Sequence, residues 1–126
     1  MQALLLATLA IAGKPDPDAV RAMEQQAVDN GRTLYALADE IAKSNAECLN
    51  RPNVNAKSIL GYLDTYIASA WAQKGIANVL RCQTGVEAEF QCQKAMTCEQ
   101  VRAIAEDDDA PRPCAATGLA VRDACP

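Results

Sequence analysis

The chain has 126 residues, about the size of one domain; half of them are hydrophobic but only 4% are aromatic, so Ala, Leu, Ile and Val must form the core. The formal net charge of −4 argues against a nucleic-acid partner, because phosphate binding requires a basic face. The sequence contains no histidine, which excludes Ser-His-Asp and Cys-His catalytic arrangements and imidazole metal sites.

The first twelve residues carry no charged side chain and include an apolar run rich in Leu and Ala. This pattern resembles a secretory signal peptide, with small residues at Ala10 and Ala12, the two positions that a signal peptidase reads. We expect cleavage after Ala12, so that residues 13–126 form a single domain. The alternative is an uncleaved, buried first helix. A membrane span is rejected, because it would need about 20 apolar residues.

Two helices are predicted next, over residues 19–30 and 32–48. The Pro-Asp-Pro-Asp segment at 15–18 is suited to open the first helix, and Asn30-Gly31 is typical of a helix end. The second helix is amphipathic, with Leu, Ile and Ala recurring at three-and-four spacing.

A third helix is predicted between the Asn-rich loop at 50–55 and Leu80. Gly75 costs about 1 kcal/mol relative to Ala inside a helix, so we expect a kink or a close neighbour there. The apolar side chains that share one side of a 3.6-residue period are Ile59, Leu60, Leu63, Tyr66, Ile67, Ala70 and Trp71.

The Gln-Thr-Gly sequence at 83–85 predicts a break in the chain. Residues 86–93 alternate apolar and polar side chains, which suggests a strand. Their Glu, Ala and Gln content favours a helix, and a lone strand would have no partner, so we favour the helix and leave the strand as the alternative.

Thr97 and Gln100 resemble a capping box, which predicts a short helix over 98–106. The prolines at 111 and 113 predict that the segment after this helix is irregular. The expected fold is therefore all-α: a small disulfide-stapled bundle of about four helices with an irregular C-terminal tail.

Six cysteines are expected to form disulfides, because an even number in a small exported domain usually means paired thiols. Buried free thiols in a cytosolic protein are the alternative. No Cys-x-x-Cys is present, so neither a thioredoxin-type site nor a zinc knuckle is indicated. We expect Cys48 to reach Cys98, Cys114 or Cys125, and Cys82 to lie near Cys92. The predicted disulfide residues are Cys48, Cys82, Cys92, Cys98, Cys114 and Cys125.

The acidic residues provide formal candidates for acid-base chemistry in Asp39-Glu40 and in Glu87 with Glu89. Neighbouring residues on a helix point in different directions, so solvated surface is the preferred interpretation. We therefore expect no enzyme activity, no cofactor and no metal.

The run 106–109 lacks calcium-loop spacing and is interpreted as a solvated helix end, or as an acidic patch for a cationic partner.

The third predicted helix and its flanks form the only basic segment of any length, with Arg51, Lys57, Lys74 and Arg81 against Asp64. Tyr62, Tyr66 and Trp71 lie on the same helix, where core packing is their expected role, although Tyr and Trp are frequent in binding hot spots. The candidate interface is made of Trp71, Lys74, Arg81, Glu106, Asp107, Asp108 and Asp109.

Lys74-Gly75 followed by Leu80-Arg81-Cys82 is similar to a short segment of the helical immunity proteins that neutralise type VI secretion amidases in the periplasm. The similarity is too short to identify a family, and the cysteine spacings of insect odorant-binding proteins and saposins are absent. We expect a non-catalytic periplasmic or secreted module that binds another protein, such as an inhibitor or immunity protein. The alternatives are a carrier of a small apolar or anionic ligand and an enzyme that uses carboxylates.

Overall fold

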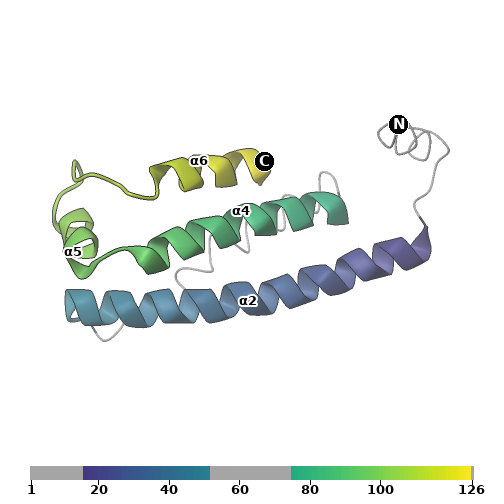
Figure 1. Cartoon of the computed structure of the whole chain (residues 1–126), viewed down its shortest axis with the longest axis horizontal. Coiled ribbons are helices and arrows are strands. Elements are labelled where there is room, and N and C mark those ends of the chain that lie inside the picture. Colours follow the sequence, from purple (N-terminus) through teal and green to yellow (C-terminus); the bar gives the residue numbers. More distant parts are fainter. Residues whose placement is uncertain (1–15, 52–74, 126) are drawn as a thin grey trace.

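The computed structural model describes residues 16–51 and 75–125. These ranges contain the helices α2 (Pro17–Leu49), α4 (Ile76–Ala95), α5 (Cys98–Glu106) and α6 (Ala115–Ala124), and no strand. The protein is thus a small, disulfide-stapled all-α bundle, as its composition predicts (Figure 1). The strongest predicted stripe, residues 59–71, lies outside the described residues.

The helices α2 and α4 run side by side in the same direction, and α6 runs back along α4 (Figure 1). Gln83, in the first half of α4, contacts Ala27, whereas Lys94, near the end of α4, pairs with Glu40. Later residues of α4 therefore lie beside later residues of α2, as expected for parallel helices. The short helix α5 packs against the C-terminal part of α2.

The predicted helix end at Asn30-Gly31 is wrong, because α2 is one continuous helix of 33 residues. The Asn30 side-chain amide donates a hydrogen bond to Gln83 Oε1 (3.2 Å), and Gln83 Nε2 donates to the Ala27 carbonyl (2.9 Å). Gln83 is buried, so this polar bridge fixes α4 to α2 beside Gly31. Packing between the helices therefore outweighs the local tendency of Asn-Gly to end a helix.

The ends of α2 follow standard capping rules. Pro17 occupies the first turn, and the Asp16 carboxylate at the N-cap accepts a hydrogen bond from the Asp18 backbone N–H (3.2 Å). The C-cap is Asn50, in the left-handed conformation at φ 53°. The predicted start near residue 17 and end near residue 48 are thus confirmed.

The predicted break at 83–85 is also wrong, because α4 continues through Gly85. A Cβ atom placed at Gly85 would lie 3.2 Å from the Ala124 Cβ, so the glycine allows α6 to pack closely against α4. Residues 86–93 are helical, which confirms the preferred interpretation over the strand. Gly75 is the N-cap of α4, and its φ of +73° lies in the left-handed region that favours glycine.

The capping box at the start of α5 is confirmed. The Thr97 hydroxyl oxygen accepts from the Gln100 N–H (3.1 Å), and Gln100 Oε1 accepts from the Thr97 N–H (2.9 Å). The C-terminal tail is less irregular than its prolines suggest, because both prolines precede α6 and leave its interior free to form a helix.

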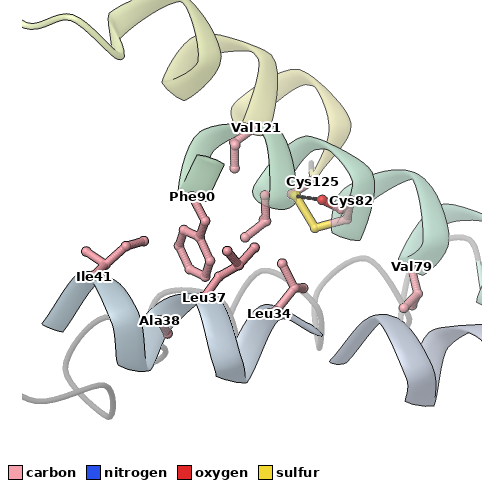
Figure 2. Close-up of a cluster of buried hydrophobic side chains, with 10 residues drawn as sticks. Leu34, Leu37, Ala38, Ile41, Val79, Cys82, Phe90, Val121 and Cys125 are labelled. Carbon is pink, nitrogen blue, oxygen red and sulfur yellow. Dashed lines mark hydrogen bonds between the residues drawn. A yellow bond between two sulfur atoms is a disulfide. The ribbon is translucent and has the colours of Figure 1, made fainter. Parts of the chain in front are cut away.

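The core joins three helices around Phe90 and Leu37 (Figure 2). Seven of its ten buried residues are aliphatic and one is aromatic, which agrees with the low aromatic content. Its buried residues are Leu34, Leu37, Ala38 and Ile41 from α2, Val79, Cys82, Val86 and Phe90 from α4, and Val121 and Cys125 from the α6 segment.

Three disulfides join the helices and leave no free cysteine. Cys48 pairs with Cys98, one of its three predicted partners. The expected proximity of Cys82 to Cys92 is wrong: Cys82 pairs with Cys125, and Cys92 with Cys114. Because Cys82 and Cys92 lie in one continuous helix, ten residues of rise separate them by about 15 Å, well beyond disulfide reach.

Candidate functional site

An open hollow of about 280 Å³ lies where α4, α5 and the start of α6 meet. We call it the α5 hollow. Met96 and Ile104 provide an apolar wall, while Glu89, Gln93 and Arg112 bring polar groups. Its lining residues are Glu89, Gln93, Met96, Ile104, Arg112, Cys114 and Ala115.

Glu89 is the carboxylate of this hollow, and it is half-buried. Its carboxylate accepts hydrogen bonds from the Thr117 hydroxyl of α6 and from Gln93 Nε2 (2.9 Å) one turn along α4. These two donors hold the Glu89 side chain in place, and no described cation forms an ion pair with it. Glu87 is exposed on another side of α4, so the two residues do not form a carboxylate pair.

The loop from 107 to 114 contributes Arg112 and Cys114 to the hollow and is held at both ends. Asp107 caps α5, and its side chain accepts a hydrogen bond from the Asp109 N–H (2.9 Å). At the other end, Cys114 is bonded to Cys92 of α4. Arg112 extends from this loop, and its Nη2 donates to the Asp108 carbonyl (3.5 Å).

The acidic run Glu106–Asp109 lies on the same loop and at the end of α5. All four residues are exposed, and none forms an ion pair with any residue of the described ranges 16–51 and 75–125. The helix α5 ends at Glu106, so the three aspartates that follow lie outside it.

The described members of the predicted interface lie in two separate places. Arg81 is exposed near the beginning of α4, next to Cys82, and its Nη2 donates to Asn78 Oδ1 (3.0 Å). The acidic run lies beyond the other end of α4 (Figure 1). Arg51 is exposed just after α2. The other predicted interface and basic-segment positions, Trp71, Lys74, Lys57, Tyr62, Tyr66 and Asp64, lie outside the described residues.

The remaining carboxylate candidates serve in ion pairs on the surface. The Asp39 carboxylate lies 2.9 Å from Lys43 Nζ, and the Glu40 carboxylate lies 2.7 Å from Lys94 Nζ. The hydrogen bond to Asp39 and the negative charge of Asp39 raise the pKa of Lys43 above the usual 10.5. The described part of the chain contains no group of three acidic or cysteine side chains arranged to hold a metal ion.

Comparison of the chain with family models, curated proteins and solved structures finds no match. Within the described ranges, no helix is both long enough and apolar enough to cross a membrane.

Sequence reasoning identified the acidic run but missed the hollow beside it. The hollow brings together residues from α4, α5 and the loop that leads into α6, which are separated by up to 26 positions between Glu89 and Ala115. The capping box at Thr97 was the local signal that pointed toward the hollow, because it showed where α5 begins.

Proposed function

We propose that the protein is a non-catalytic, exported module that binds another protein through the acidic run beside α5. The proposal rests on one observation. The four exposed acids have no described counter-ion, and they lie on the segment 98–114, which a disulfide fixes at each end. Cys98, at the start of α5, is bonded to α2, and Cys114 is bonded to α4. A segment held in this way loses little conformational freedom on binding.

Export is the second part of the proposal. Three disulfides support an oxidising compartment, because such bonds are rare in the cytosol. The apolar leader at 1–12 fits this compartment, and the periplasm or the extracellular space would provide it. Intact-mass measurement on exported material tests this part, with a mature chain beginning at Gly13 expected.

A carrier of a small ligand is the competing function, and the α5 hollow is the observation in its favour. A carrier needs an enclosed, mostly apolar pocket of about 300 to 1,000 Å³. The hollow is open and holds about 280 Å³, with three of its seven lining residues charged or amide-bearing. These properties favour a protein partner over an enclosed small molecule.

The proposal is tested by capturing the partner from the cell envelope and measuring its affinity at low and high salt. We expect the native protein to lose affinity as salt rises, because complementary charges at a protein interface are screened by ions. Changing Asp107, Asp108 and Asp109 to Asn should weaken binding by about tenfold at low salt and reduce the dependence on salt.

The matched control removes the same number of charges from exposed residues elsewhere, through Glu24→Gln, Glu87→Gln and Asp123→Asn. This variant should bind as the native protein does. If the Asn variant binds as tightly as the control and keeps the native salt dependence, the acidic run is not the binding surface.

A further inference from the structure

We infer that the α5 hollow receives a lysine side chain from the bound partner, an inference that rests on the proposed function. The hollow is slightly smaller than pockets that enclose drug-sized molecules, which start near 300 Å³. Its volume of about 280 Å³ and its opening to solvent suit one long side chain that enters from outside.

The lining matches the two chemical parts of a lysine. The apolar stem of a lysine packs against hydrophobic surface while its charged head stays near polar groups. Met96 and Ile104 provide that surface, and the flexible thioether of a methionine adapts to the shape of a guest. The Glu89 carboxylate provides the partner for the ammonium group.

Glu89 is suited to this role because its position is fixed while its charge is not neutralised. Thr117 and Gln93 donate one hydrogen bond each, and an ionised carboxylate has about four acceptor sites. Acceptor capacity is therefore left for an ammonium group. Since Glu89 forms no ion pair with a described residue, its charge is available to an incoming cation.

The lining itself holds one acid and one base, Glu89 and Arg112, so the charges of the segment that leads into the hollow decide between a cation and an anion. Between positions 106 and 112, four acids stand against the single Arg112. An approaching cation is attracted by the acidic run before it reaches Glu89, whereas an anion is repelled by the same run. Arg112 repels a cation at the hollow itself. Removing the charge of Arg112 should therefore strengthen lysine binding, whereas removing the charge of Glu89 should weaken it.

The test is an NMR titration of the full mature protein with a short acetylated Gly-Lys-Gly-Lys-Gly peptide. We expect amide shifts to change around Gln93, Met96, Ile104 and Ala115. Glu89→Gln should weaken peptide binding by about threefold to tenfold, and Arg112→Gln should strengthen it. The same peptide with acetylated lysines, which keeps the stem but lacks the charge, should bind more weakly.

Ile104→Lys is a second variant that leaves the hydrogen bonds of Glu89 in place and puts an ammonium group of the protein itself in the hollow. It should abolish the shifts caused by the peptide. Circular-dichroism melts establish that each variant is folded. The inference is overturned if the hollow shows no shifts, if a Glu-containing peptide binds there instead, or if Arg112→Gln weakens lysine binding.

The captured partner separates this inference from the proposed function. If the Asn variant of the acidic run weakens partner binding but Glu89→Gln and Ile104→Lys do not, the lysine inference fails and the proposed function stands. If none of these variants changes partner binding, both are wrong.

Discussion

Gly31 and Gly85 both lie inside helices, yet their surroundings differ. Apart from its chain neighbours and the adjacent backbone of α2, no described atom lies within 4 Å of a Cβ placed at Gly31, so its missing side chain makes no room for another element. A Cβ placed at Gly85 would lie 3.2 Å from the Ala124 Cβ, so the missing side chain lets α6 pack closely on α4. Gly31 therefore only lowers the stability of its helix, whereas Gly85 is required by the packing of α6.

Gly31→Ala should raise the free energy of unfolding by about 0.5 to 1 kcal/mol, because alanine restricts the unfolded chain and favours the helix. Gly85→Leu should lower it by about 1 to 3 kcal/mol, because the added side chain would collide with α6. Denaturant unfolding with intact disulfides measures both changes. A destabilising Gly31→Ala would show that the space beside Gly31 is occupied.

At the level of elements, the three disulfides differ in their access to solvent. The bond between Cys82 and Cys125 lies in the core, with 0% and 2% exposure at its two residues. Cys98 is exposed, and Cys92 and Cys114 are half-buried beside the α5 hollow. A thiolate must reach a sulfur atom to reduce a disulfide, so access should determine the order of reduction.

Limiting reductant should open the Cys48–Cys98 and Cys92–Cys114 bonds before the Cys82–Cys125 bond. Alkylation at successive times, followed by peptide mass mapping, measures the order. Full reduction in denaturant is the control, in which all six cysteines should be alkylated together. Early alkylation of Cys82 or Cys125 under native conditions would contradict the core position of that bond.

The helical elements could be predicted largely from the sequence, because periodicity and capping are local signals. The capping box at Thr97 and the start at Pro17 were correct. The continuity of α2 and α4 was missed, because it depends on Gln83 bridging to Asn30 and on α6 packing against Gly85. Local rules cannot show such contacts between distant residues.

The candidate site was predictable only in part for the same reason. The run of four acids at 106–109 can be recognised from the sequence alone, and all four residues are exposed in the structure. Glu89 and Cys114 line one hollow because the disulfides bring the loop before α6 against α4. Six cysteines can pair in 15 ways, so the sequence alone does not show this pairing. The hollow therefore became visible only once the helices were placed.

Within residues 16–51 and 75–125, the helices α2, α4 and α6 share one core. Phe90 is the only phenylalanine of the chain and is 5% exposed in this core. Leu119, on α6, is 60% exposed.

Phe90→Ala should lower the free energy of unfolding by about 3 to 5 kcal/mol, because it leaves a cavity between the helices. Leu119→Ala is the control on the surface and should change it by less than about 0.5 kcal/mol. Thermal melts of both variants with intact disulfides provide the measurement. Similar losses from both changes would show that the core is not centred on Phe90.

The parallel arrangement of α2 and α4 also affects how the chain behaves during synthesis. The contact between Gln83 and Ala27 joins positions 56 residues apart. At about 5 to 20 residues per second, the apolar side of α2 leaves the ribosome roughly 3 to 11 s before the part of α4 that covers it. During this interval the nascent chain presents Leu34, Leu37 and Ile41 without that cover. Chaperones can bind this uncovered apolar side until α4 has emerged.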